Sequence, residues 1–267
     1  MSCKIIAEIG WNHMGDMNLA KEMISAAAES GADYAKFQTW SVANLKDGPW
    51  NADGRLEIYK KAELSRDQHA DLMEYCNAKN IQFLTSIFNI NDAQWLSEVC
   101  GHAIKIPSHE IYNSELIKEV DGKFESLFVS TGAARWSEVE MIPQIIEESD
   151  CTLLHCVSAY PCSFENINLP RIRALRELSP SVGYSGHLFG IEDAIAALSY
   201  DIDLIEKHFT IDRTLPGRDN ENAILPEEMK TLTDYSRSYF SMNIDKGREF
   251  QNSELDVVEN YRGRWSK

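Results

Sequence analysis

The sequence predicts an α/β fold and, within that class, a (β/α)8 TIM barrel. Short apolar runs alternate with helical stretches about eight times in 267 residues. Almost every apolar run ends on polar residues, and the ends of the strands are where such a barrel carries its active site. An open doubly wound sheet produces the same alternation, but it gathers its polar strand ends at one switch point. The spread of polar ends over all eight units favours the closed barrel.

The predicted strands are short and apolar, as expected when both faces of a parallel sheet are covered. They cover residues 5–9, 34–38, 82–86, 103–106, 126–130, 152–155, 182–185 and 204–209. Helices are expected over residues 19–30, 66–79, 92–99, 114–120, 137–148, 169–178, 191–199 and 226–239. The first helix keeps apolar side chains at helical spacing and stops at Gly31. Strand–helix alternation favours parallel pairing through right-handed crossovers.

Two segments fall outside the repeating unit. Residues 40–64 form a long insertion after the second strand, and loops of that length in a compact domain are usually functional. Beyond about Phe240 the chain becomes charged and irregular. We therefore expect a catalytic barrel over residues 1–240 and a tail over residues 241–267 without a second domain.

Composition limits the partners and the location of the chain. The net charge of −16 argues against binding to nucleic acid, and an anionic substrate would need a few local basic side chains to reverse that field. A strand begins directly after Lys4, with no signal peptide and no membrane-spanning stretch, so we expect a cytoplasmic protein that does not bind membranes. The six cysteines contain no CxxC pair and are expected to be reduced thiols.

Strand parity predicts a pair of histidines at one point. Because side chains alternate along a strand, Glu206 and His208 share one face while Lys207 points the opposite way. Ser185 and His187 share a face in the same manner. The seventh and eighth strands of a barrel are neighbours, so the two histidines can meet. Two imidazoles with open positions suit a divalent first-row metal, although a strand-end histidine also serves as an ordinary hydrogen-bonding residue.

Three charged residues lie inside apolar strands. Lys36 is flanked by Ala35 and Phe37, and Lys105 lies between two isoleucines. A buried lysine needs an anionic partner, so both favour an anion-binding site over a surface role. Glu8 lies in the first apolar run, where an unpaired carboxylate would be costly, and we expect it to meet a sugar hydroxyl or a cation.

Several blocks of sequence resemble the sialic acid (N-acetylneuraminate) synthase family. The resemblance runs in order from residue 4 to about residue 235. Its blocks are residues 7–16, 31–39, 105–111, 130–132, 154–161, 183–187, 205–210 and 216–219. The motifs are specific for the family and much less specific for its sugar.

The resemblance implies a condensation of phosphoenolpyruvate with the open-chain aldehyde of an acylamino sugar, which yields a nonulosonic acid and phosphate. It implies a divalent metal, manganese or magnesium, on His187 and His208. The positions that match phosphoenolpyruvate contacts are Lys36, Ser86, Lys105, Ser108 and Ser185, with Ser158 where some members have asparagine. The positions that match sugar contacts are Glu8, Gln38, Tyr160, Asp219 and, through a loose alignment, Asn51. Glu206 and Glu110 match positions near the reacting centre, and these two and Glu8 are the expected catalytic residues.

The chain departs from the family pattern at two places that matter below. Gly186 stands where the family commonly has aspartate, directly before the first metal histidine. The resemblance does not extend into the small antifreeze-like domain that usually completes the sugar site of a partner subunit. We therefore expect a homo-oligomer in which the insertion or the tail helps to close that site.

Two other readings of the same residues stay open. A Schiff-base aldolase or lyase would use Lys36 or Lys105 as its nucleophile on the same barrel. A non-catalytic homologue would bind a sugar or a partner synthase. Retention of both histidines, both lysines and Glu206 argues against the non-catalytic homologue.

Overall fold

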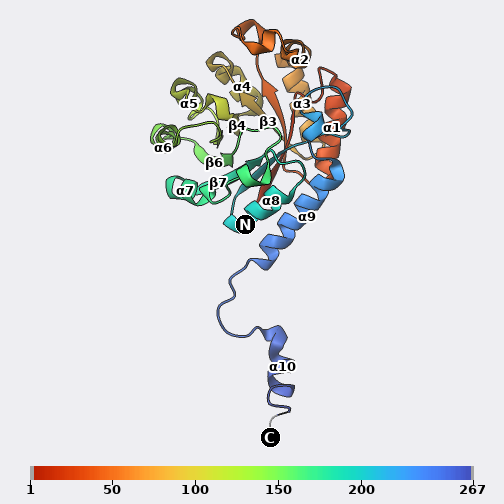
Figure 1. The fold of residues 1–267 in the computed structure, drawn as a ribbon, viewed down its shortest axis with the longest axis vertical. Coiled ribbons are helices and arrows are strands. Elements are labelled where there is room, and N and C mark those ends of the chain that lie inside the picture. The colour runs from red at the N-terminus through yellow and green to blue at the C-terminus, as the bar shows by residue number, and fades with distance from the viewer. Residues whose placement is uncertain (1–2, 266–267) are drawn as a thin grey trace.

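A computed structural model describes residues 3–265, and its core is a closed barrel of eight parallel strands in sequence order (Figure 1). The strands are β1 (Lys4–Gly10), β2 (Tyr34–Thr39), β3 (Gln82–Ile87), β4 (Ala103–Ile106), β5 (Ser126–Ser130), β6 (Asp150–Cys156), β7 (Ser181–Gly186) and β8 (Leu204–His208). The predicted fold class is confirmed, and each predicted strand overlaps the observed one. The first and last strands pair in parallel, so the sheet has no open edge.

Most of the helices surround the barrel on its outer face, one lies in the insertion and one lies in the tail. They are α1 (Met17–Glu29), α2 (Arg55–Ala62), α3 (Arg66–Ala78), α4 (Ala93–Cys100), α5 (Ser114–Val120), α6 (Trp136–Ile145), α7 (Arg171–Leu178), α8 (Glu192–Ala197), α9 (Pro226–Met242) and α10 (Leu255–Asn260). Side-chain caps define several of their starts. Asp16 accepts hydrogen bonds from two backbone amides at the start of α1, and Ser65 with Gln68 forms a capping box on α3.

Two helices lie outside the set expected from the sequence, one of them in the tail that was expected to be irregular. The insertion contains α2, and the tail contains α10 after a short 3₁₀ turn. Neither helix has a wide apolar face: α2 buries only Ala62, and none of the residues of α10 is buried. Periodicity therefore offers little signal for either helix, because that signal depends on a buried stripe.

The barrel interior is layered along its axis. Seven inward side chains form a closed apolar cluster in the lower half: Ile6, Tyr34, Leu84, Ala103, Phe128, Leu154 and Leu204. The residue two positions further along each of these strands points to the same interior. These residues are polar: Glu8, Lys36, Ser86, Lys105, Ser130, Cys156 and Glu206. The apolar layer thus forms a floor, and the chemistry lies directly above it at the carboxyl ends of the strands.

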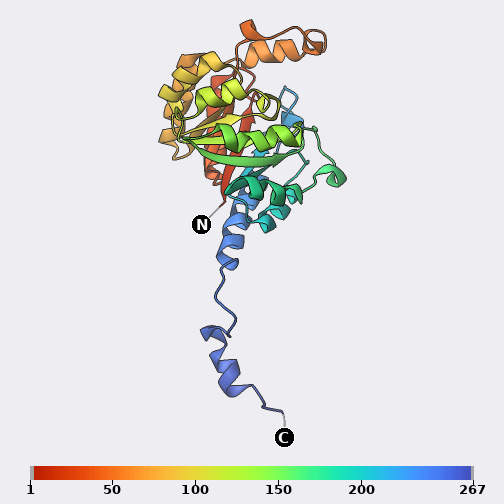
Figure 2. The same ribbon diagram turned by 90° about the vertical axis from the view of Figure 1, so that its left-hand side faces the viewer.

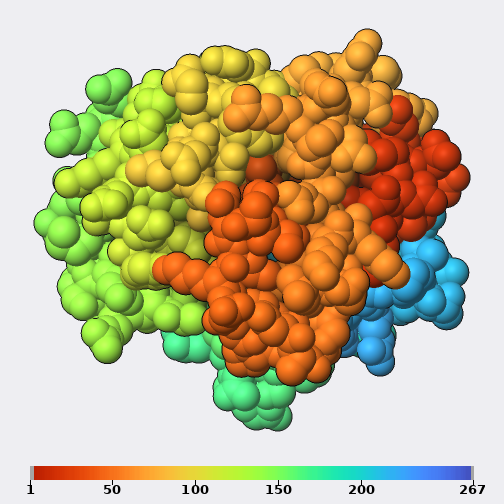
Figure 3. All heavy atoms as spheres, turned by 90° about the horizontal axis from the view of Figure 1, so that it is seen from above, coloured from red at the N-terminus to blue at the C-terminus, as the bar shows by residue number. Residues whose placement is uncertain are grey.

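The insertion lies over that carboxyl-terminal face. Figure 2 shows it at the end of the barrel opposite the N-terminus, and Figure 3 shows its orange atoms over the middle of the face. An aromatic cluster anchors it: the Trp40 ring lies 6.0 Å from Trp11, 5.8 Å from Tyr59 and 6.1 Å from Phe88. The Trp40 indole N–H also donates to the Tyr59 carbonyl at 3.2 Å. The insertion is therefore attached to the first and third strand ends.

The tail extends away from the opposite end of the barrel, beyond α9 (Figures 1 and 2). Its side chains from Ser241 to Phe250 are exposed to solvent. Within residues 3–265 the structure contains no helix with the length and apolar character needed to span a bilayer.

Candidate active site

Four buried charged side chains form a network above the apolar floor. Lys36 Nζ lies 2.7 Å from Glu8 Oε2 and 3.8 Å from Glu206 Oε2. Lys105 Nζ lies 3.8 Å from the same Glu206 oxygen. All four side chains are at least nine-tenths buried. The effective dielectric constant around them is therefore lower than in water, which strengthens each attraction. The network brings residues of β1, β2, β4 and β8 to one point.

Hydroxyl groups add hydrogen bonds to this network, while Glu8 Oε2 and Glu206 Oε2 meet lysines without a hydrogen bond of good geometry. Lys36 donates to Ser86 Oγ at 3.0 Å, and Lys105 donates to Ser130 Oγ at 2.6 Å. Ser185 donates to Glu206 Oε1 at 2.9 Å. Because each charge has a hydrogen-bonding partner besides its ion pair, the network is tolerated in the barrel interior.

The two carboxylates differ in protonation. Burial and, to a smaller extent, repulsion from Glu206 raise the pKa of Glu8 to about 7. The attraction of Lys36 opposes both effects but does not cancel them. Burial also disfavours ionised Glu206, but Lys105 and Lys36 outweigh it and lower its pKa to about 2. Glu206 is therefore the anion of the pair, while Glu8 exchanges a proton near neutral pH.

The two lysines differ as well. Burial disfavours the charged form of Lys36, but its neighbours Glu206 and Glu8 more than compensate and raise its pKa. Burial lowers the pKa of Lys105, and Lys36 adds to that effect. An anion near Lys105 would supply the compensating charge that the protein provides only in part.

A cradle of small polar groups lies beside Lys105. A Cβ placed on Gly132 would come within 2.5 Å of Ser158 Oγ and 2.9 Å of Ser108 Oγ, so both hydroxyls lie against this glycine. Ser108 donates to Cys156 Sγ at 3.4 Å. The arrangement offers hydroxyl groups and a cation to one anion. Glycine at position 132 keeps the space between the two hydroxyls open, and any side chain there would fill it.

The histidine pair lies at the neighbouring strand ends, as strand parity predicted. The rings of His187 and His208 are 5.5 Å apart, and the Tyr160 ring is 4.1 Å from that of His187. The Nδ1–H of His187 is directed at the Val157 carbonyl, 2.8 Å away, which leaves Nε2 as its free nitrogen. Burial and the nearby His187 hold the pKa of His208 well below its ordinary value, so that ring is neutral.

This pair fits a divalent metal with open positions. His208 Nδ1 is buried without a hydrogen bond and lies 3.4 Å from Asp219 Oδ2. An unpaired buried imidazole nitrogen is costly unless a ligand uses it. No three His, Cys, Asp or Glu side chains of the described chain converge as a closed metal site. The protein would therefore supply two imidazoles and leave the other positions to water and substrate.

A bulge at the end of β1 holds Glu8 in place. The β1–β2 register shifts between Glu8 and Gly10, and Gly10 has a φ of +55°. Gln38 donates to Glu8 Oε1 at 2.6 Å. A Cβ on Gly10 would lie 3.1 Å from both of these side-chain groups, so glycine here permits both the turn and the contact.

Two predicted site residues lie outside the network. Asn51 is exposed and donates to Asp47 Oδ1 within the insertion, so the structure gives it no contact with the strand ends. Glu110 accepts a hydrogen bond from Asn113 at 3.3 Å and faces Lys46 of the insertion. Both residues lie in loops that follow strands. In a loop, unlike a strand, the spacing of residues along the sequence does not determine where a side chain points.

The hydrogen bonds of two further residues near the strand ends decide whether they belong to the site. Thr131 uses its amide and its hydroxyl on the Leu154 carbonyl, so it has no donor left for a phosphate. Cys156 lies in the site, with Sγ 3.9 Å from His187 Nδ1. Although burial opposes ionisation, His187, Ser108 and Lys105 lower the pKa of this thiol to about 7. Its inward parity on β6, shared with Leu154, was the available signal.

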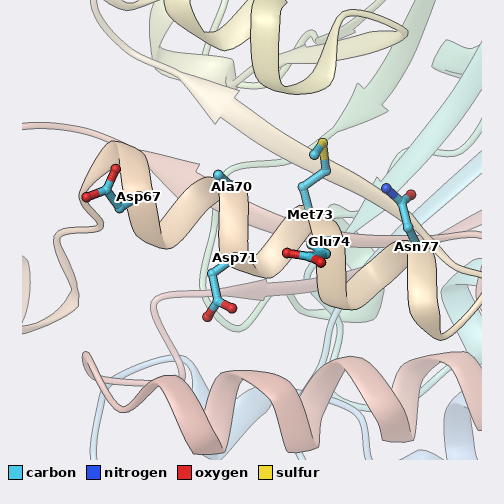
Figure 4. A pocket seen from close by; sticks show the side chains of 6 residues that line it. All are labelled: Asp67, Ala70, Asp71, Met73, Glu74 and Asn77. Carbon is cyan, nitrogen blue, oxygen red and sulfur yellow. The ribbon is translucent and has the colours of Figure 1, made fainter.

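A separate hollow lies on the outer surface of α3 (Figure 4). Asp67, Ala70, Asp71, Met73, Glu74 and Asn77 line it. It contains three carboxylates and no basic side chain, so it would repel an anionic substrate. The strand ends, with their paired charges, are the better candidate for the active site.

Comparison with known proteins gives the family. The NeuB family model matches residues 23–247. The N,N'-diacetyllegionaminic acid synthase of Campylobacter jejuni is 36% identical over 245 residues, covering 85% of this chain and 73% of the relative. The enzyme of the same name from Legionella pneumophila is 38% identical over 251 residues, covering 87% and 70%.

A solved structure agrees with these sequence relatives. The N-acetylneuraminic acid (sialic acid) synthetase of Leptospira borgpetersenii, crystallised with citrate, superposes with a TM-score of 0.88 at 32% identity. The match covers 99% of this chain and 93% of that one. Together with the barrel and the residues at its strand ends, these matches show that the chain belongs to the NeuB family.

Proposed function

We propose that this protein condenses phosphoenolpyruvate with the open-chain aldehyde of an N-acylamino sugar, giving a nonulosonic acid and phosphate. The observation that carries the proposal is the pair of buried lysines beside the ionised Glu206, directly next to the His187–His208 pair. The names of the relatives, which are synthases of legionaminic and sialic acids, support the product class.

The anionic substrate binds through the lysines and the serine cradle. Phosphoenolpyruvate carries a carboxylate and a phosphate, and both need cations or hydroxyl donors in a chain of net charge −16. Lys105, Ser108 and Ser158 offer these groups on one side of Glu206, and Lys36 with Ser86 offers them on the other. The bound anion also offsets the burial of Lys105.

His187 and His208 would hold a divalent metal, manganese or magnesium. When bound, that metal polarises the aldehyde oxygen of the sugar and stabilises the negative charge that develops there. Asp219 and Tyr160 lie next to the two rings and are available for the sugar hydroxyls. The neutral state of His208 suits a ligand, because a protonated imidazole has no free lone pair.

The carboxylates serve the carbon chemistry. Carbon 3 of phosphoenolpyruvate forms a bond to the aldehyde carbon, and carbon 2 becomes cationic. Glu206 is ionised and buried beside this position, so it stabilises that positive charge. The former aldehyde oxygen takes up a proton and becomes a hydroxyl. A water adds to carbon 2 and gives one proton to a base. The bond from carbon 2 to the phosphate-bearing oxygen then breaks, phosphate leaves with that oxygen, and the added hydroxyl loses its proton to become the ketone. Glu8, with a pKa near 7, is suited to that proton transfer.

The direct test measures phosphate release from phosphoenolpyruvate with a panel of acylamino hexoses, their phosphates and plain aldoses, each with and without Mn²⁺. We expect release only with an acylamino sugar and metal. His208→Ala should abolish release, whereas His102→Ala, which changes a ring packed on Tyr34 near the amino ends of the strands, should leave it intact. Release that is independent of sugar and metal, or full activity in His208→Ala, would refute the proposal.

One observation favours the Schiff-base aldolase as the second candidate. Burial lowers the pKa of Lys105, which is a property of imine-forming lysines. Borohydride reduction with pyruvate, followed by mass spectrometry, separates the two reactions. The condensation predicts no adduct on either lysine, and a reduced pyruvate adduct on Lys105 would favour the aldolase.

A further inference from the structure

A second buried ion pair lies on the outer side of the barrel, directly behind the histidine pair. Lys207 Nζ lies 3.1 Å from both oxygens of Asp193 and donates to the Leu188 carbonyl at 2.8 Å. The Tyr184 hydroxyl donates to Asp193 Oδ2 at 2.9 Å. Lys207, Asp193 and Tyr184 are 2%, 2% and 3% exposed, so the cluster is sealed from water. None of its side chains points to the substrates.

The position of this cluster couples it to the candidate metal ligands. Lys207 lies between Glu206 and His208 on β8, and its outward direction is what places its two neighbours inward. Gly186, directly before His187, pairs with Lys207 in the β7–β8 register. Asp193 comes from the first turn of α8. The ion pair therefore ties α8 to the strand end that carries His208, and Tyr184 ties it to the strand that carries His187.

Glycine at position 186 makes this contact sterically possible. A Cβ on Gly186 would lie 2.3 Å from Asp193 Oδ2 and 2.6 Å from Tyr184 Cε1, closer than real Cβ atoms approach their neighbours. The carboxylate of Asp193 thus occupies the space that a side chain at position 186 would need. The space beside Lys207 holds one carboxylate, and Asp193 of α8 supplies it.

We propose that Asp193 is a positioning residue that holds the carboxyl ends of β7 and β8, and hence His187 and His208, at the separation that a metal requires. Its effect passes through Lys207. Without the carboxylate, the buried ammonium would be unpaired, and such a group draws in water or moves the strand that carries it. Since His208 is the next residue, that movement changes the metal site. This inference rests on the proposed metal-dependent function.

The first experiment measures Mn²⁺ affinity from the electron paramagnetic resonance signal of the free ion. In Asp193→Asn we expect affinity for Mn²⁺ to fall about 10- to 100-fold, the range seen when groups that orient metal ligands are removed. Phosphoenolpyruvate binding without metal, measured by calorimetry, should change by less than about threefold, because Lys36 and Lys105 lie on other strands.

Asp203→Asn is the matched control. Asp203 joins the same two strands at their amino ends, where its carboxylate accepts from the Val182 amide at 3.1 Å and from Arg176 at 3.2 Å. We expect this variant to lower the melting temperature and leave Mn²⁺ affinity within about twofold of the wild type, since the site lies at the other end of the barrel. An equal loss of Mn²⁺ affinity in both variants would reduce Asp193 to a general stabilising residue and overturn the inference.

The second experiment moves the carboxylate from the helix to the strand, and its first readout, the melting temperature, needs neither metal nor activity. Gly186→Asp alone places two carboxylates in one space, and Asp193→Gly alone leaves Lys207 unpaired, so each should lower the melting temperature by roughly 10 °C. The double variant should recover at least half of that loss, and Mn²⁺ affinity should recover with it. Additive losses would overturn the inference.

The outcomes separate the two proposals. A wild-type protein that binds no Mn²⁺ refutes the metal site and with it the positioning role. A wild-type protein that binds Mn²⁺ while Asp193→Asn binds it equally well refutes the positioning role alone.

Discussion

Lys36 is the side chain on which most of the charges in the site depend. It is the nearest cation to Glu8 and one of two cations beside Glu206. The apolar neighbours of Lys36 in the sequence predicted a buried lysine that needs an anionic partner, and the structure shows it 2% exposed beside Glu8 and Glu206. The identity of its partners came only from the structure, because they lie 28 and 170 positions away along the chain.

Substituting Lys36→Met should weaken the binding of phosphoenolpyruvate more than it slows turnover. Loss of a charged hydrogen bond costs about 1.5–3 kcal/mol, so we expect the KM for phosphoenolpyruvate to rise about 10- to 100-fold, with a smaller fall in kcat. Steady-state kinetics at saturating sugar measures both constants.

Lys4→Met is the control for this substitution. Lys4 forms a half-exposed ion pair with Asp33 at the other end of the barrel, and its loss should leave KM within about twofold. A collapse of kcat in Lys36→Met with an unchanged KM would contradict the anion-binding role.

Glu8 predicts a specific dependence of stability on pH. Its pKa rises from 4.5 to about 7 on folding, so the folded protein binds this proton more tightly than the unfolded chain does. Its contribution to stability is present below pH 4.5 and is lost as the pH rises through about 7. Glutamine keeps the shape and has no proton to lose, so Glu8→Gln should gain stability relative to wild type between pH 5 and pH 8.

Urea unfolding at both pH values tests this expectation. Glu206 is the internal comparison, since its pKa is lowered and its contribution is lost only as the pH falls toward about 2. A constant stability difference between wild type and Glu8→Gln over the range from pH 5 to pH 8 would show that Glu8 does not titrate there.

At the scale of single elements, the insertion is the segment whose role the structure clarifies most. Its attachment depends on the contact of Trp40 with Trp11, Tyr59 and Phe88, which come from three different elements. Trp50 belongs to the same insertion but lies near its outer turn, where its indole donates to the Lys46 carbonyl. The two tryptophans are therefore a matched pair for a test.

Trp40→Ala should detach the insertion from the carboxyl-terminal face of the barrel. Large-to-small changes at fully buried aromatic side chains cost about 3–5 kcal/mol; Trp40 is half-buried, so its loss costs less, and part of it falls on the local contact that places α2. We expect the KM for the sugar to rise at least fivefold while that for phosphoenolpyruvate stays within twofold, about 1 kcal/mol against less than 0.5 kcal/mol. Trp50→Ala should change neither constant. Equal effects of the two substitutions on sugar use would contradict a role for the aromatic cluster.

For the whole molecule, the tail is the segment with the least contact to the barrel. Seven large hydrophobic side chains from residue 242 onward are exposed: Met242, Ile244, Phe250, Leu255, Val257, Tyr261 and Trp265. Monomeric proteins rarely expose so many along one segment, which favours a partner. The segment also carries Arg262 and Arg264, while the chain has a net charge of −16, so a second copy offers a surface of complementary charge.

Truncation after Gly247 should therefore convert an oligomer into a smaller species. We expect light scattering to show the change in mass, and we expect sugar use to weaken more than phosphoenolpyruvate binding, because the lysines and serines lie within the barrel. Trp265→Ser in the full-length chain is the milder variant and should shift the oligomer equilibrium in the same direction. A truncated protein with wild-type mass and kinetics would exclude the tail from both roles.

The sequence by itself determined the barrel and most of the inward residues of the site. Eight apolar runs with polar ends specify parallel strands covered on one side, and alternation along each strand then assigns Lys36, Lys105, Glu206 and His208 to the interior. These inferences need only local periodicity, which a single chain displays directly.

Only the tertiary structure decided which residues contact one another when they come from helices and loops, because strand alternation does not assign their side chains to a face. Asp193 lies on a helix, and its contact with Lys207 depends on how α8 packs behind two strands. Cys156 belongs to the site and Glu110 lies outside its charged network, because neighbouring strands and loops set their surroundings. The pKa difference between Glu8 and Glu206 has the same origin, since Lys105 lies 3.8 Å from Glu206 and is a main cause of the lowered pKa of that carboxyl. Such contacts join residues far apart in sequence, and their distances follow from packing alone.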